Sequence, residues 1–145
     1  MTSPVQLRPA VEEDADALVP LLAELGYAVT ADVVRDNVRR LARTDVDRVW
    51  VAEREGTLLG VVSVHLTPLF HAAGYQGRVT SLVVSAAARG HGIGRILMRQ
   101  AEAFCWAAGC ARVELTSGDH RAEAHRFYEG LGYRVQSRRY VKDRG

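Results

Sequence analysis

The 145-residue sequence predicts an α/β (α+β) fold in the order βαα-βββ-α-β-α-β, within one domain covering residues 1–145. Two patterns support this fold class. Apolar residues recur at helical spacing in some segments and alternate with polar residues in others. Gly residues follow several of the helical segments, where helices commonly stop. The chain has the length of one domain, and no repeat or Pro- or Ser-rich linker divides it.

The first part of the chain predicts one strand and two helices. Val5 and Leu7, followed by Pro9, indicate a short strand. A helix follows, because four leucines share one helical face before Gly26: Leu18, Leu21, Leu22 and Leu25. A second helix is expected to begin after Thr30, a suitable N-cap, with three apolar residues on one face: Val34, Val38 and Leu41.

A hairpin and a third strand are predicted next. Residues 50–52 and 58–64 are apolar and flank a turn at Glu55-Gly56. A loop is expected over Leu66–Gly77, and a further strand over Arg78–Val84.

The remaining elements are a helix, a strand, a short helix and a closing strand. The longest helix is expected from Ile93 until Gly109, since its apolar residues recur at helical spacing: Ile93, Leu97, Ala101, Phe104 and Ala108. Val113 and Leu115 alternate with polar neighbours as in a strand. A short helix is predicted over Ala122–Leu131, and the closing strand contains Tyr133, Val135 and Tyr140.

The composition is that of an ordinary globular protein, with 48% hydrophobic and 25% charged residues. The net charge of +2 is too small to indicate a nucleic-acid or membrane partner. No apolar stretch approaches the length of a spanning helix, and the first residues lack the features of a signal peptide, so a cytoplasmic protein is expected. Cys105 and Cys110 form no CxxC motif and are expected to be buried free thiols, with no metal site.

The most informative segment is a glycine-rich turn between the strand ending at Val84 and the helix beginning near Ile93. The N-terminus of a helix attracts anions, because its first N–H groups have no intrahelical partners and the macrodipole is positive there. Gly92 and Gly94 would let a diphosphate approach the backbone. Arg89 and His91 add charge or hydrogen-bond donors.

Two other phosphate-binding motifs fit this turn poorly. The loop of nucleotide triphosphatases requires Lys and then Ser or Thr after its last Gly, whereas Arg95 and Ile96 follow Gly94. A dinucleotide fingerprint would need Gly where Arg95 stands, although Glu114 lies at a suitable distance for its acidic residue.

Arg89–Gly94 resembles the coenzyme A pyrophosphate motif of the GCN5-related N-acetyltransferase (GNAT) superfamily, and Leu82–Val84 resembles that family's preceding strand. Ala124–Tyr133 is similar to its second signature, a helix with a Phe-Tyr pair that ends in Leu-Gly-Tyr. The resemblance implies a central mixed, twisted β-sheet flanked by helices on both faces. It also implies a wedge for the pantetheine arm between Thr80–Val84 and Arg112–Thr116.

The resemblance further implies acetyl-coenzyme A (acetyl-CoA) as cosubstrate. The residues implied to bind it are Leu82, Val83, Val84, Arg89, Gly90, His91, Gly92, Ile93, Gly94 and Arg95. Tyr128 resembles the family's general acid, since a phenol with an ordinary pKa near ~10 can protonate the departing thiolate. The alternative for Tyr128 is a packing role beside Phe127 on an amphipathic helix.

The general base is left open by the sequence. Thr80 and Ser81 stand where many family members carry a carboxylate, and neither hydroxyl is a base at neutral pH. The candidate acceptor-binding residues are His65, His71, Tyr75 and Thr80. Either His65 or His71 could serve as base, and residues 119–121 could also face the acceptor.

These inferences predict an N-acetyltransferase that moves the acetyl group of acetyl-CoA to a primary amine by direct attack on the thioester. The acceptor is expected to be a small molecule, because the charge is near neutral and the loop Leu66–Gly77 is apolar and aromatic. Three alternatives stay open: a non-catalytic acetyl-CoA binding or sensing domain, a lysine or N-terminal protein acetyltransferase, and a dinucleotide-binding oxidoreductase. Whether the chain forms a homodimer is also open.

Overall fold

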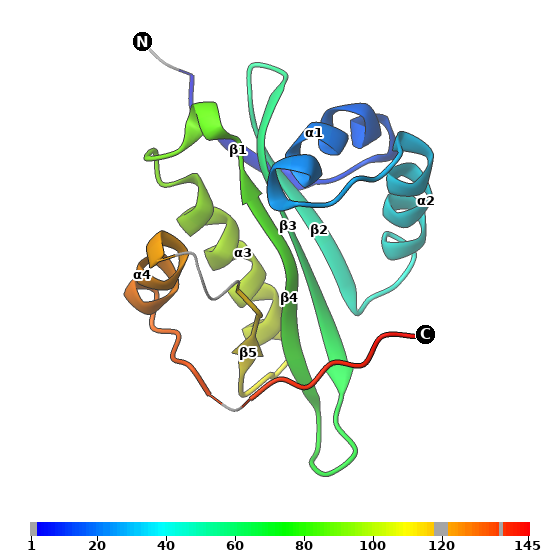
Figure 1. Ribbon diagram of the computed structural model, residues 1–145, viewed down its shortest axis with the longest axis vertical. Helices are drawn as coiled ribbons and strands as arrows, with labels where there is room; N and C mark the ends of the chain where they lie inside the picture. The colour runs from blue at the N-terminus through cyan, green and yellow to red at the C-terminus, as the bar shows by residue number, and fades with distance from the viewer. Residues whose placement is uncertain (1–2, 118–121, 137) are drawn as a thin grey trace.

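The computed structural model describes residues 3–117, 122–136 and 138–145. Five strands form one mixed sheet in the order β1-β2-β3-β4-β5 (Figure 1). The first four strands pair antiparallel, and β5 pairs parallel to β4. The strands are β1 (Gln6–Pro9), β2 (Asp47–Arg54), β3 (Thr57–Pro68), β4 (Tyr75–Val84) and β5 (Val113–Glu114).

Helices cover both faces of the sheet, as predicted. The four α-helices are α1 (Ala15–Leu25), α2 (Ala31–Leu41), α3 (Ile93–Ala107) and α4 (Ala122–Gly130). Two short 3₁₀ turns, η1 (Glu12–Asp14) and η2 (Ala86–Ala88), precede α1 and α3. In Figure 1, α1 and α2 lie on one side of the strands, and α3 and α4 lie on the other. None of the helices that the structure describes is long and apolar enough to cross a membrane.

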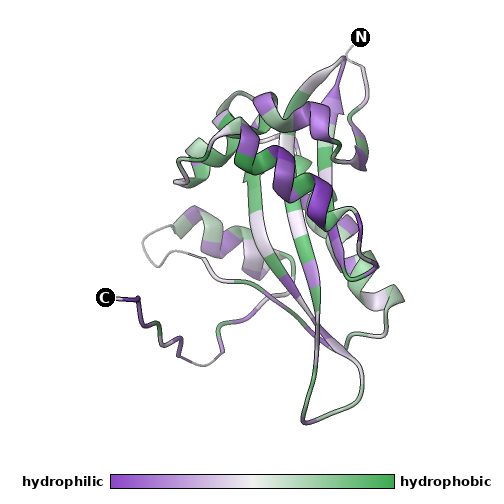
Figure 2. Ribbon diagram, turned by 90° about the vertical axis from the view of Figure 1, so that its right-hand side faces the viewer, coloured by the Kyte–Doolittle hydropathy of each residue, from purple (hydrophilic) through white to green (hydrophobic). Residues whose placement is uncertain are grey.

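The sheet separates two hydrophobic cores. Alternate residues of β3 enter one core with α3, among them Val62 and Val64, both fully buried. Val61 and Val83 point to the opposite core, with α1 and α2. This division follows from the two-residue period of a strand. Figure 2 shows hydrophobic stretches along the strands and hydrophilic residues on the outer faces of the helices.

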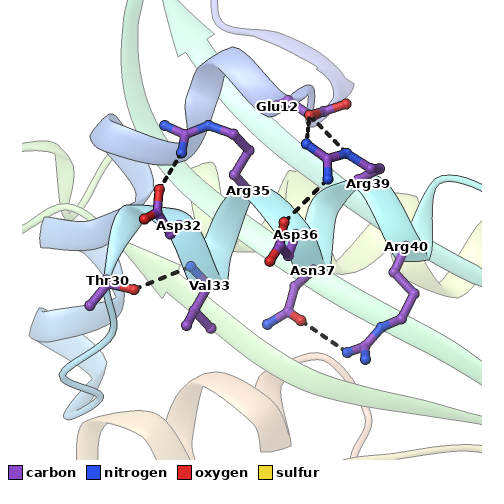
Figure 3. Close-up of polar contacts among 9 residues, drawn as sticks. All are labelled: Glu12, Thr30, Asp32, Val33, Arg35, Asp36, Asn37, Arg39 and Arg40. Atoms are coloured by element: carbon purple, nitrogen blue, oxygen red, sulfur yellow. Dashed lines mark hydrogen bonds and ion pairs between the residues drawn. The ribbon is translucent and has the colours of Figure 1, made fainter.

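The ends of α1 and α2 are set by local sequence. Gly26 ends α1 in the left-handed conformation, with φ of 109°, which Gly adopts at little cost. Thr30 caps α2, since its hydroxyl accepts a hydrogen bond from the Val33 N–H at 3.2 Å (Figure 3). Figure 3 also shows the ion pairs on the exposed side of α2, where Arg39 bonds both Asp36 and Glu12.

The structure confirms the expectation for the two cysteines and corrects the ends of one predicted loop. Cys105 and Cys110 are buried free thiols, and burial raises the pKa of Cys105 to about 12. The predicted loop Leu66–Gly77 is wrong in extent, because β3 continues to Pro68 and β4 begins at Tyr75. Pairing of Thr67 with Gln76 extends the hairpin, so only residues 69–74 connect the strands.

The predicted closing strand is also wrong, since residues 131–136 and 138–145 hold no strand. Tyr133 packs its ring against Tyr128, with centroids 6.0 Å apart, and donates a hydrogen bond to Glu102 of α3 at 2.7 Å. These contacts direct the segment toward α3 and α4. Val135 and Tyr140 are 95% and 88% exposed, so they bury no surface against the sheet.

A charged cluster joins β1, β2 and the start of α1. The guanidinium of Arg8 contacts Asp14 through two hydrogen bonds of 2.8 and 2.9 Å, and it also contacts Glu53 at 3.0 Å. Asp14 accepts a further hydrogen bond from the Val11 N–H. The bonds from Arg8 hold the pKa of the Asp14 carboxyl below its ordinary value, although burial acts to raise it.

Asp14→Asn is expected to lower the free energy of unfolding at pH 7 by about 1–3 kcal/mol, the range for hydrogen bonds to a charged group. A lowered folded-state pKa means that the carboxylate stabilises fully above its unfolded pKa near ~3.9 and loses this contribution as the pH falls through the folded-state value. Urea unfolding at pH 7 and pH 3 checks this, and the difference from wild type should shrink in acid. The matched control is Asp16→Asn, at an exposed position. An equal loss at both pH values would contradict the prediction.

Candidate active site

The wedge predicted between two strands lies between β4 and β5. The two strands pair only at Gly77 with Val113 and at Arg78 with Glu114. Beyond Arg78 the pairing ends, while β4 continues to Val84 against β3. One backbone edge of residues 79–84 is therefore not paired to β5, and an extended ligand can use it as a neighbouring strand would.

A cavity of ≈ 360 Å³ occupies this wedge. Residues 79–82 of β4 line one side, and residues 115–117 after β5 line the other. Ala124 and Tyr128 of α4, with Leu25 and Tyr27 at the end of α1, complete the lining. The cavity thus lies where strands, α1 and α4 meet, and its wall is partly apolar with several hydroxyl groups.

A β-bulge in β4 sets the direction of Thr80. Ser63 pairs with Ser81 and Val64 pairs with Val79, so Thr80 is an extra residue without a partner on β3. A bulge redirects a side chain and locally twists its strand. Here it places Thr80 on the face of β3 that carries Ser63 and His65, with its Oγ1 2.7 Å from Oγ of Ser63 and 2.7 Å from Nε2 of His65.

The glycine-rich turn has the backbone of a helix start built around two left-handed residues. Gly90 and Gly92 have φ of 85° and 76°, which side chains disfavour. Gly92 is the N-cap of α3, and the Ile96 N–H is bonded to the Gly92 carbonyl. This is the first hydrogen bond of the helix, so the N–H groups of residues 93–95 have no acceptor within α3. Ile93 is buried and anchors the turn to the core.

The turn offers backbone N–H groups and open space, both of which a diphosphate site requires. A Cβ built on Gly92 would meet nothing within 4 Å, so the space above this residue is open. Gly94 differs, because a Cβ there would lie 3.2 Å from Cζ of Phe127. The absence of a side chain at Gly94 thus lets α4 approach α3. Arg89, His91 and Arg95 are exposed around the turn.

Glu24 of α1 is the one acidic side chain that the described residues place against this turn. Its Oε1 accepts a hydrogen bond from the Ala86 N–H at 2.9 Å and lies 3.8 Å from Nη2 of Arg89. The carboxylate thus contacts a backbone donor at the start of η2, just before the glycine-rich turn. The sequence pattern gave no indication of Glu24, because 62 residues separate it from Ala86.

Tyr128 lines the cavity, as a general acid must. It lies on α4, across the cavity from Thr80 and Leu82 of β4. Its ring packs edge-on against Phe127, with centroids 5.1 Å apart, and against Tyr133. These contacts hold the half-buried ring in one orientation while its position keeps it at the cavity.

The structure divides the four candidate acceptor residues into two pairs. His65 and Thr80 lie together, with Nε2 of His65 2.7 Å from Oγ1 of Thr80. His71 and Tyr75 are exposed at the tip of the β3–β4 hairpin, which projects past the helices in Figure 1. Neither is among the described residues that line the cavity. Residues 119–121 lie outside the described residues.

Asp47 was not among the residues that the sequence pattern singled out. Its carboxylate lies 2.7 Å from Nδ1 of His65 and accepts a hydrogen bond from the Thr44 hydroxyl. Asp47 and His65 are Cα partners on neighbouring strands, so only the register of β2 with β3 reveals their contact. No group of three metal-ligating side chains occurs within the part of the chain that the structure describes.

Comparisons with known proteins agree with this geometry. The sequence pattern of the Acetyltransferase (GNAT) family matches residues 13–133. An aminoalkylphosphonate N-acetyltransferase of Salmonella typhimurium is 32% identical over 94% of this chain and 90% of its own length. A glucosamine 6-phosphate N-acetyltransferase of Trypanosoma brucei brucei is 29% identical over 96% and 95% of the two chains.

The fold agrees as well. The crystal structure of a Trypanosoma brucei acetyltransferase superposes with a TM-score of 0.83 and 26% identity, over 97% of this chain and 99% of the other. The family match covers most of the chain, and the matching structure has the same sheet and helices over almost its whole length. The chain belongs to the GNAT family of acetyltransferases.

Proposed function

We propose that this acetyltransferase transfers the acetyl group of acetyl-CoA directly to the primary amine of a small molecule. The observation that carries the proposal is the cavity between β4 and β5, bordered by the open edge of β4 and Tyr128. The glycine-rich turn follows β4 directly, at the start of α3. One extended ligand can therefore bind the turn with its diphosphate and place its other end in the cavity.

Each part of the site has a chemical task in this proposal. Bound acetyl-CoA supplies an activated acyl carbonyl. The N–H groups of residues 93–95 bind the diphosphate, and the open edge of residues 79–84 orients the pantetheine arm. Tyr128 donates a proton to the sulfur that leaves. The walls of the cavity exclude water from the transfer, which strengthens the polar interactions inside it.

The acceptor is proposed to be a small amine, with two arguments in support. The two curated relatives are named for aminoalkylphosphonate and glucosamine 6-phosphate, and each of these is a small molecule. The cavity volume of ≈ 360 Å³ suits ligands of that size. The apolar and aromatic residues of the β3–β4 connection do not support a small acceptor. Phe70 there is fully exposed and does not line the cavity.

A panel of amines is expected to separate small acceptors from proteins. The panel contains aminoalkylphosphonates, hexosamine phosphates, the same amines without phosphate, polyamines, aminoglycosides and basic peptide tails. Release of the coenzyme A thiol measures turnover, and kcat/KM for at least one small amine should exceed that for every peptide by at least about tenfold, a modest difference of ~1.4 kcal/mol in transition-state binding.

Thermal unfolding with acetyl-CoA, coenzyme A and NAD provides the matched control for the ligand class. Only a ligand that binds the folded chain raises its apparent stability. Stabilisation by acetyl-CoA and coenzyme A but not by NAD is expected. A peptide tail used far better than any small amine would overturn the acceptor class. Binding of acetyl-CoA without any turnover would instead favour a binding or sensing domain.

A further inference from the structure

Four polar side chains form a continuous hydrogen-bonded chain across β2, β3 and β4. Asp47 contacts Nδ1 of His65 at 2.7 Å, and Nε2 of His65 contacts the hydroxyl of Thr80 at 2.7 Å. The Thr80 hydroxyl also contacts the Ser63 hydroxyl at 2.7 Å. The chain reaches the cavity at Thr80, which belongs to the cavity wall.

The register of the sheet brings these residues together. Asp47 and His65 are directly opposed on β2 and β3. Without the bulge, strict alternation along β4 would turn Thr80 and Ser81 to opposite faces. The extra residue lets Thr80 reach the side of β3 that carries Ser63 and His65. The arrangement therefore depends on an irregularity of the strand at the cavity.

The direction of each hydrogen bond follows from the charge of Asp47. Burial acts to raise the pKa of this carboxyl, but hydrogen bonds from His65 and Thr44 outweigh it and the pKa is lowered. An ionised carboxylate only accepts, so Nδ1 of His65 carries the hydrogen. In the neutral imidazole that acts as a base, Nε2 is then the acceptor. Thr80 then donates to Nε2 and accepts from Ser63. Its oxygen keeps one lone pair for a ligand.

We propose that Asp47, His65 and Thr80 form a relay that removes the proton from the acceptor ammonium ion. This inference rests on the proposed function. The ammonium N–H donates its proton to Oγ1 of Thr80, and the hydrogen already on Thr80 passes to Nε2 of His65. The products are a neutral amine with a free electron pair and an imidazolium ion beside the Asp47 carboxylate. The imidazolium later returns its proton to water, and no other reactant is consumed.

The charged groups around His65 support this direction of transfer. Asp47 on β2 is the carboxylate in contact with the ring and stabilises the imidazolium. Arg48 follows Asp47 on β2, and its guanidinium donates to the backbone carbonyls of Asp47 and Thr44 at 2.7 and 2.9 Å while lying over the Phe104 ring. Its charge also acts to lower the pKa of the Asp47 carboxyl, which favours the ionised form. Arg78, the Cα partner of His65 on β4, bonds Glu114 of β5 at 3.0 Å.

The relay also places proton removal and proton donation on different elements. Thr80 on β4 and Tyr128 on α4 line the same cavity, so a reacting centre between them can lose a proton to one and receive a proton from the other. In this proposal no carboxylate is needed at Thr80 or Ser81. The base is His65 on the neighbouring strand β3, and the proton reaches it through the Thr80 hydroxyl.

The test measures kcat/KM against pH, with the best amine of the panel, for wild type, His65→Gln, Asp47→Asn and Thr80→Val. His65→Gln is expected to lower kcat/KM at pH 7 by about 10²–10⁴-fold while leaving the Kd for acetyl-CoA unchanged. Activity should recover as the pH approaches the pKa of the free amine, because solvent then supplies the neutral form. Thr80→Val should show the same loss of kcat/KM and the same recovery at high pH. In this variant His65 is intact, so the loss would show that the proton must pass through the Thr80 hydroxyl.

Two controls separate a proton relay from a structural role. Asp45→Asn, at an exposed position near Asp47, should keep wild-type kinetics. In wild type, ¹⁵N NMR of His65 should show hydrogen on Nδ1 at neutral pH, and Asp47→Asn should change this tautomer balance. Circular dichroism and acetyl-CoA binding verify that each variant folds.

Three outcomes would overturn the relay. A His65→Gln enzyme with wild-type kcat/KM and pH profile would overturn it alone and leave the acetyltransferase assignment intact. Acetylated Thr80, found by mass spectrometry after acetyl-CoA is mixed with the enzyme, would show a covalent route in its place. A wild-type enzyme that acetylates no amine would overturn the proposed function and, with it, the relay.

Discussion

A side chain at position 92 is expected to weaken acetyl-CoA binding strongly while the protein still folds. Gly92→Asn tests this most directly, because Asn tolerates a positive φ better than other residues and φ here is 76°. The new side chain would occupy the open space above the turn, where a Cβ meets no protein atom. Loss of even one or two charge-assisted hydrogen bonds to the diphosphate should weaken binding by at least about 10-fold to 100-fold.

Isothermal titration with acetyl-CoA measures the effect, and Gly56→Asn is the matched control. Gly56 also has a positive φ, of 80°, and a Cβ there meets nothing within 4 Å. It lies in the turn between β2 and β3. Both variants bear the same kind of backbone strain, so only the change at position 92 should affect affinity. Unchanged affinity in a folded Gly92→Asn protein would place the diphosphate elsewhere.

Gly94 is a poorer choice for this test. Any side chain there must displace Phe127, which would disturb the packing of α4 against α3 along with the ligand site. Valine would also be a poor choice at position 92, because a β-branched residue is strained by the positive φ there.

Features with a local cause could be predicted from the sequence. The end of α1 at Gly26 and the start of α2 at Thr30 depend on backbone preference and on a cap only three residues away. The glycine-rich turn is contiguous, so its backbone shape is also encoded locally. The spacing of apolar residues in α3 was enough to predict the length of this helix, because one helical face enters the core.

Features that depend on contacts between distant segments could not be predicted in the same way. Gly77 and Pro68 are turn-forming residues, yet cross-strand pairing carries β4 through Gly77 and β3 as far as Pro68. The closing segment alternates like a strand, but the bond from Tyr133 to Glu102 draws it toward α3.

The same reason explains which parts of the site were missed. Tyr128 and the glycine-rich turn belong to contiguous signatures. The contact of Asp47 with His65 joins residues 18 apart, and it requires both the strand register and the side on which each residue lies. The bulge at Thr80 adds one residue to one strand only, so a pattern of period two cannot place its side chain.

Tyr128→Phe is expected to lower kcat by about 10²–10⁴-fold, the usual contribution of a positioned general acid. Phe keeps the ring and its edge-on contacts with Phe127 and Tyr133, so the Kd for acetyl-CoA should stay close to wild type. The loss should be smaller for an acyl donor whose thiol is more acidic, because such a leaving group needs less protonation. Steady-state kinetics with two acyl thioesters measure this difference.

Tyr133→Phe is the matched control, since it also removes one phenolic hydroxyl next to the same ring. The Tyr133 hydroxyl donates to Glu102, whose residue is only 6% exposed. Its removal leaves a buried carboxylate with one hydrogen bond fewer, and the free energy of unfolding should fall by about 1–3 kcal/mol. The folded Tyr133→Phe enzyme should retain wild-type kcat. Equal kcat in Tyr128→Phe and wild type would show that the Tyr128 hydroxyl donates no proton in the reaction. Tyr128 would then have only a packing role.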